Sequence, residues 1–88
     1  MEKEYLIGWY YLEQGMEGIP NLEPAFIVKA KDKKEAIKKY PKDIKKQMKG
    51  YGHICLIGEI KNGNILIEKD FYNIHGIVND VFKRAKRI

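Results

Sequence analysis

Hydrophobic and polar positions along this chain follow the period of strands in some segments and of helices in others. Two early segments, Tyr5 to Leu12 and Ala25 to Ala30, are rich in aromatic and β-branched residues and predict strands. Both faces of the first segment are apolar, which is typical of a central strand covered on both sides. The stretch between them, Glu13 to Pro24, holds two glycines and two prolines and predicts a long loop.

The clearest local signal is Asn62-Gly63, which lies between two isoleucine-rich runs and predicts a type I′ hairpin turn. A two-residue loop at this point pairs Ile60 with Ile65, and it also pairs Gly58 with Ile67 and Leu56 with Lys69. The alternation predicts one buried apolar face, made of Ile54, Leu56, Ile60, Ile65 and Ile67. The opposite face then carries His53, Cys55, Ile57, Glu59, Leu66 and Glu68.

A helix is predicted after Asp32, which with Glu35 forms a pair resembling a capping box. Pro41 either kinks this helix or begins a second one. At 100° per residue the predicted apolar stripe is centred on Ile37, Ile44 and Met48, with Ala36 and Tyr40 beside it.

The last segment of the chain also has helical periodicity. Apolar residues recur there at spacings of three and four from Ile74 to Ile88, which predicts an amphipathic helix. Asn73 or Asp70 is the expected N-cap.

The predicted order is ββαββα in a single α+β domain over residues 1–88. We expect a two-layer sandwich, an antiparallel sheet with two helices on one face. The other sheet face would then be partly open and would carry Ile57 and Leu66, the candidate interface residues. A small chain with such an open apolar face is expected to self-associate as a homodimer.

Charge is unevenly distributed. The chain has a formal net charge of +5, yet residues 29–49 alone carry ten lysines against three acidic residues. Five of these lysines fall on one side of the predicted helix, and they are the candidate nucleic-acid-binding residues: Lys34, Lys38, Lys42, Lys45 and Lys49. Lysines at this spacing could contact successive phosphates. The alternative is a solvated helix face in a lysine-rich composition, as found with an AT-rich genome or a thermophile.

A second basic cluster is Lys83, Arg84, Lys86 and Arg87, near the end of the last predicted helix. The helix dipole favours cations at that position, so a structural role is sufficient to explain it. These two arginines are the only ones in the chain. Because arginine is the usual reader of guanine, their scarcity disfavours sequence-specific base recognition.

Reactive side chains come together at only one predicted place, where His53, Cys55 and Asp70 share a sheet face, with His75 nearby in sequence. No paired ligand spacing, phosphate loop or dinucleotide fingerprint accompanies them. We therefore expect no enzymatic activity, no cofactor and no metal site. The single cysteine and the acidic N-terminus, without a signal-peptide pattern, predict a cytoplasmic protein that does not enter membranes.

These observations predict a small non-enzymatic binding or regulatory module. Its expected partner is anionic, nucleic acid before an acidic protein surface, and is bound through the lysine-rich helix. The alternative is a protein–protein interaction module or inhibitor that acts as a homodimer through the open sheet face.

Overall fold

The computed structural model describes residues 2–12 and 18–88. They form a mixed α+β domain, which confirms the predicted class. Residues 13–17 of the expected Glu13 to Pro24 loop lie outside this description. In chain order the elements are β1 (Lys3–Leu12), β2 (Pro20–Asn21), β3 (Phe26–Ala30), α1 (Lys33–Lys38), α2 (Lys42–Gln47), β4 (His53–Lys61), β5 (Asn64–Ile67), a 3-10 helix η1 (Lys69–Ile74), α3 (His75–Arg84) and β6 (Lys86–Arg87).

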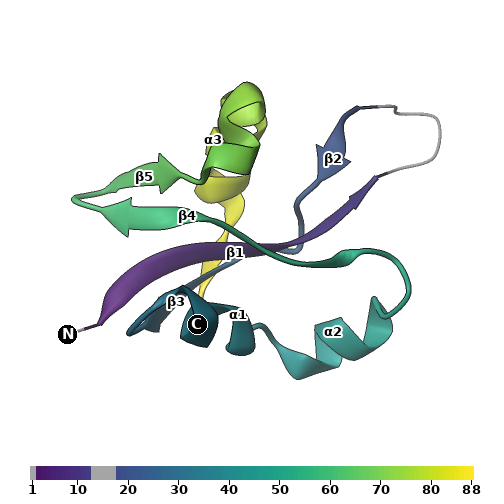
Figure 1. Ribbon diagram of the computed structural model, residues 1–88. Coiled ribbons are helices and arrows are strands. Elements are labelled where there is room, and N and C mark those ends of the chain that lie inside the picture. The colour runs from purple at the N-terminus through teal and green to yellow at the C-terminus, as the bar shows by residue number, and fades with distance from the viewer. Residues whose placement is uncertain (1, 13–17) are drawn as a thin grey trace.

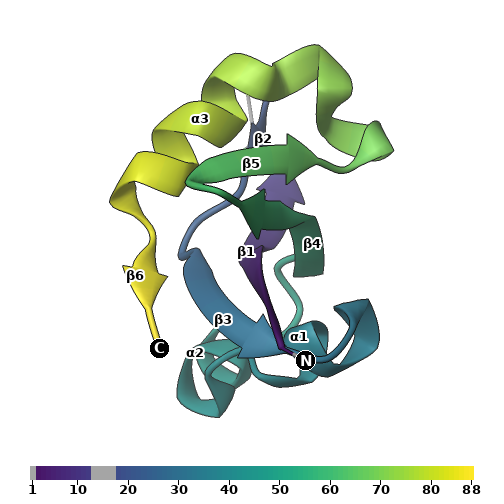
Figure 2. The ribbon, with the colours of Figure 1, turned by 90° about the vertical axis from the view of Figure 1, so that its left-hand side faces the viewer.

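The strands form one six-stranded sheet in the order β5-β4-β1-β3-β6, with β2 paired to β1 beyond the end of β3. The pairs are antiparallel except for β3 and β6, which run parallel (Figure 2). The expectation of a wholly antiparallel sheet was therefore wrong at this edge. The helix predicted to reach Ile88 ends at Arg84, and Ala85 is extended, so the chain can pair with β3. The Ile88 backbone N–H then donates to the Ile27 carbonyl at 3.0 Å.

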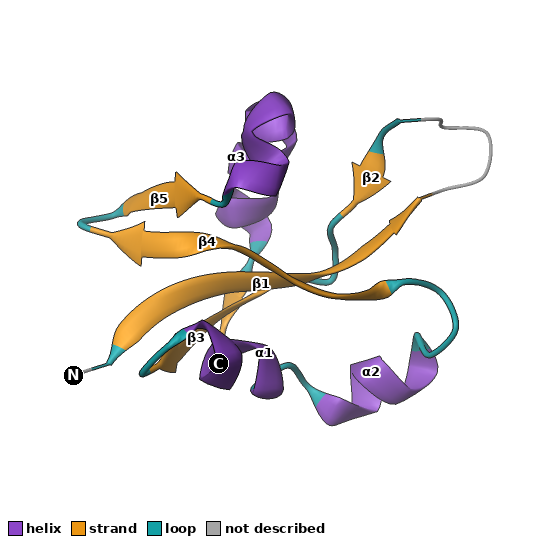
Figure 3. Ribbon diagram, viewed as in Figure 1, coloured by secondary structure: helices purple, strands orange, loops and turns teal. Residues whose placement is uncertain are grey.

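The helices cover both faces of the sheet, so the predicted two-layer arrangement with both helices on one face was wrong. In Figures 1 and 3, α1 and α2 lie below the sheet and α3 lies above it. Ala36 and Tyr40 pack under β1 with Trp9, while Val78 and Val81 pack on the opposite face. The central strand β1 is thus covered on both sides, as its two apolar faces predicted.

The hairpin between β4 and β5 has the predicted register, with Ile60 opposite Ile65 and Gly58 opposite Ile67. Asn62 and Gly63 both have positive φ, 54° and 80°, as a type I′ turn requires. The predicted pairing of Leu56 with Lys69 does not form, because β5 ends at Ile67 and Lys69 begins η1.

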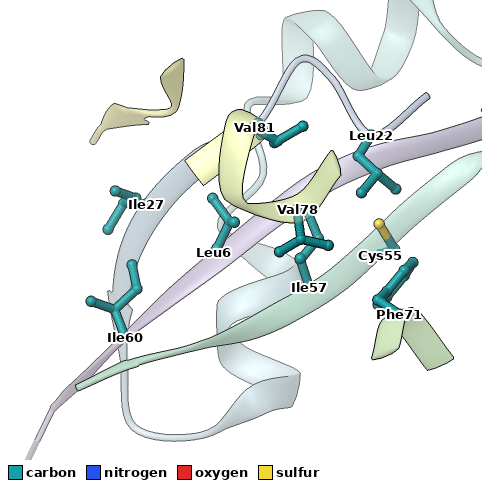
Figure 4. Packing of buried hydrophobic residues seen from close by; sticks show 10 residues of the cluster. Leu6, Leu22, Ile27, Cys55, Ile57, Ile60, Phe71, Val78 and Val81 are labelled. Carbon is teal, nitrogen blue, oxygen red and sulfur yellow. The ribbon is translucent and has the colours of Figure 1, made fainter. Parts of the chain in front are cut away.

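A β-bulge changes which side chains of β4 are buried together. Leu6 of β1 lies opposite Gly58, and the next residue, Ile7, lies opposite Leu56, which leaves Ile57 as the extra residue. Side chains of β4 on the N-terminal side of Gly58 therefore point to the opposite sheet face from the one that the alternation predicted. Ile57 joins Ile60 under α3, where it is completely buried (Figure 4).

The predicted apolar face of the hairpin was accordingly wrong in part. Ile54 and Leu56 are partly buried on the α1–α2 side, while Ile65 and Ile67 are partly buried on the α3 side.

The first helical segment is interrupted at Pro41, which becomes the N-cap of α2. The predicted cap of α1 is confirmed, since the Glu35 backbone N–H donates to Asp32 Oδ1 at 2.9 Å. The break resets the helical phase, so Ile37 is 37% exposed instead of lying at the centre of the apolar stripe. Ile44 is partly buried and packs against the core, as the stripe predicted.

The last helix is shorter than predicted. Asp70 and Asn73 fall within η1, and the N-cap of α3 is Ile74, which makes no side-chain capping bond. Neither predicted cap is therefore correct. Ile88 is 60% exposed after β6, outside the helix in which it was placed.

Candidate nucleic-acid interface

The five lysines of the predicted stripe are all exposed, but the break at Pro41 divides them between elements. Lys34 and Lys38 lie on α1, Lys42 and Lys45 on α2, and Lys49 follows α2. No carboxylate of the described residues lies within ion-pair distance of any of the five. Their charges are thus available to a partner, although they do not form one continuous helical stripe.

Four lysines surround one hollow between α2 and the start of β4. The hollow has a volume of about 460 Å³ and is lined by Lys42, Lys45, Lys46 and Lys49, together with Trp9, Gly50, Gly52, His53 and Ile54. We call these four lysines the lysine cluster. Lys46 was not among the predicted residues, because the phase of an uninterrupted helix placed it off the stripe.

The two α1 lysines are less well placed. Lys38 lines a neighbouring hollow of about 560 Å³, which Lys42 also borders. Lys34 lines neither hollow. The structure therefore brings Lys42, Lys45 and Lys49 together, connects Lys38 to them through Lys42, and leaves Lys34 apart.

Trp9 supports the wall of the lysine-cluster hollow. Its side chain is only 3% exposed, and its ring lies 5.8 Å from that of Tyr40. The indole Nε1–H donates to the Tyr51 carbonyl at 2.7 Å, which ties the segment after α2 to the central strand. Trp9 is a core residue, so it does not offer an open face for stacking.

The segment that joins α2 to β4 requires glycine at Gly52. Gly52 has φ of 107°, and a Cβ atom there would lie 2.0 Å from the Tyr10 carbonyl oxygen. A side chain at this position is therefore excluded by both backbone conformation and space. This close approach fixes the path of the chain beside the lysine cluster.

Four basic residues outside the lysine cluster form ion pairs with acidic ones. Lys33 pairs with Glu68 at 2.8 Å, and Lys39 lies 3.6 Å from Glu35. In the second basic cluster, Arg84 pairs with Glu23 at 2.7 Å and Arg87 pairs with Glu4. These pairs explain the two arginines structurally, and they leave the lysine cluster as a group of cations without acidic partners in the described part of the chain.

His53, Cys55 and Asp70 line a different hollow, of about 670 Å³, together with Tyr10 and Phe71. The three residues therefore line one hollow, although Asp70 lies on η1 and not on the sheet face predicted for it, and His75 does not line the hollow. Burial raises the pKa of the Cys55 thiol to about 12, so the thiol is protonated near neutral pH. Within residues 2–12 and 18–88, no cluster of three or more His, Cys, Asp or Glu side chains is arranged to hold a metal ion.

The buried thiol and a buried phenol give the protein a predicted alkaline instability. Burial raises the pKa of Cys55 from 9.0 to about 12 and that of Tyr40 from 10.0 to about 12. The folded state holds these protons more tightly than the unfolded state does. The contribution of the two groups to the free energy of unfolding is therefore complete below pH 9 and is lost as the pH rises toward 12. Urea unfolding at increasing pH should show the decline, and Cys55→Ala should reduce it. A native-state stability independent of pH over this range would contradict the burial of both groups.

The two candidate interface residues occupy different environments. Ile57 is completely buried under α3, so it is not available at an open sheet face. Leu66 is 56% exposed on the edge strand β5. Self-association stays a prediction, but the two residues that motivated it do not share an open face, because Ile57 lies under α3 while Leu66 is exposed.

No helix in the described residues is both long enough and apolar enough to cross a membrane. In comparisons with protein-family models, with curated proteins and with solved structures, nothing matches this chain.

Proposed function

We propose that this chain is a small non-enzymatic module that binds nucleic acid through the lysine cluster. The observation that carries the proposal is the convergence of Lys42, Lys45, Lys46 and Lys49 on one hollow, without a carboxylate of the described residues to neutralise them. Cations gathered in this way release counterions from a phosphate backbone when they bind it, which drives association.

The cluster consists of lysines alone, and this favours nucleic acid over an acidic protein surface. Protein–protein interfaces are depleted in lysine and enriched in arginine, because the guanidinium group forms directed, bidentate contacts. Lysine acts as a flexible point charge, which suits phosphates along a strand. We therefore expect binding that depends on the backbone and varies little with base sequence.

The test is a competition experiment with the full chain. A fluorescently labelled oligonucleotide is titrated with the protein at low salt, and polyglutamate of matched charge is then added as competitor. We expect the unlabelled oligonucleotide to displace the probe at much lower concentration than polyglutamate does. Equal displacement by both polyanions would support an acidic protein partner, and no binding of the labelled probe would refute the proposal.

A further inference from the structure

We propose that the nucleic acid is single-stranded and that the side chain of Tyr51 stacks on one of its bases. This inference rests on the proposed function, since the lysine cluster supplies the contacts to phosphate. Tyr51 belongs to the segment between α2 and β4. Figure 1 shows this segment on its right-hand side. Its side chain is 70% exposed, the largest exposure of any large hydrophobic residue in the described chain.

The backbone of Tyr51 is held in place although its ring is in solvent. Its N–H donates to the Met48 carbonyl at 2.9 Å, and its carbonyl accepts the Trp9 indole N–H at 2.7 Å. Gly52, which follows it, lies against the Tyr10 backbone and tolerates no side chain. The aromatic ring is therefore presented from a fixed backbone, and this arrangement lowers the entropy that is lost when a base stacks on it.

Tyr51 also lies where a base would accompany bound phosphates. Its neighbours Gly50 and Gly52 line the lysine-cluster hollow, and the same two glycines line a second hollow of about 410 Å³ with Tyr51 itself. Tyr10, Tyr11, Leu12 and His53 complete the second hollow. Tyr51 thus lines one hollow, which has aromatic side chains, and is joined through both of its neighbours to the other, which has the cations.

An exposed aromatic side chain beside a cationic groove is the arrangement by which proteins bind single strands without reading their sequence. In a duplex each base is already stacked between its neighbours, so its face is not open to Tyr51. A single strand can place a base on the ring while its phosphates contact the lysines. The structure therefore favours single strands over duplexes.

The experiment separates bases from phosphates. The full chain is titrated with a thymine single strand of about twelve nucleotides and with an abasic strand of the same length and charge. We expect the base-bearing strand to bind about tenfold more tightly, since stacking adds to the phosphate contacts. Tyr51→Ala should abolish this preference, whereas Tyr51→Phe should keep it because the ring remains.

Tyr72→Ala is the matched control, because Tyr72 is 64% exposed on η1 and lines neither the lysine-cluster hollow nor the second hollow that Tyr51 lines. This variant should keep the preference for the base-bearing strand. Equal binding of the two strands by the native protein would overturn the stacking inference while leaving phosphate binding intact. If neither strand binds at low salt, the proposed function fails as well.

Discussion

Replacing Lys42, Lys45 and Lys49 together with glutamine should lower the affinity for a single strand about a hundredfold at roughly 0.1 M salt. Each lost contact to a single-stranded phosphate removes about 0.7 from the log–log dependence of affinity on salt, and the effect accumulates over three contacts. All three side chains are exposed and line or border the same hollow, so folding should be nearly unaffected. The measurement is fluorescence anisotropy with the labelled thymine strand at several salt concentrations.

The control removes the same charge elsewhere. Lys61, Lys83 and Lys86 are exposed and have no ion pair within the described residues, and they lie outside the lysine-cluster hollow. Replacing all three with glutamine should weaken binding only slightly, because it lowers the net positive charge and hence the overall electrostatic attraction of the protein for phosphate. If both triple variants lose affinity equally, binding depends on net charge and the lysine cluster is not a site.

Replacing Ile57 with alanine should destabilise the protein by about 2–5 kcal/mol, the range for removing a buried aliphatic side chain without full collapse of the cavity. Ile57 is 0% exposed and packs against Leu6 of β1 and Val78 of α3 (Figure 4). The free energy of unfolding in urea, with the slope checked for two-state behaviour, measures the loss.

Two variants on β5 are the controls. Ile67 is only partly buried, so Ile67→Ala should lower the free energy of unfolding less than Ile57→Ala does. Leu66 is 56% exposed, so Leu66→Ala should change the free energy of unfolding by about 0.5 kcal/mol at most. A larger loss for Ile67→Ala than for Ile57→Ala would mean that the bulge is absent and that Ile57 does not lie under α3.

The sequence predicted the elements better than their assembly. The apolar residues on both sides of β1 indicated a strand covered on two faces, and the structure agrees. An apolar helix stripe identifies the buried side of a helix, yet it does not identify which sheet face that side contacts. The two apolar faces of β1 already indicated helices on both sides of the sheet, and this indication was stronger than the one for helices on a single face.

The bulge could not be read from the alternation in β4. Ile54, Leu56, Ile57 and Ile60 are all apolar, so the pattern fits either register on the N-terminal side of Gly58. Pairing with β1 decides between them, and this pairing is a tertiary contact. The end of α3 was missed for a similar reason, since apolar periodicity continues through Ala85 while pairing with β3 extends the chain.

The candidate site was predicted in part. Lys42, Lys45 and Lys49 were identified because their spacing remains helical after Pro41, whereas Lys34 and Lys38 belong to a separate helix. Tyr51, which we propose stacks on a base, was not among the predicted residues because Gly50-Tyr51-Gly52 indicated only the end of a helix. An aromatic residue between two glycines that follow a lysine-rich segment was the signal that could have pointed to it.

The most direct test of the central claim is the salt dependence of binding by the native chain. The labelled thymine strand is titrated with the protein at about 50 mM and about 200 mM salt. Four lysines that neutralise four phosphates of a single strand predict a log–log slope near −3 and a loss of affinity of about fiftyfold between these conditions. An affinity that does not change with salt, or the absence of binding at the lower salt, would contradict nucleic-acid binding through the lysine cluster.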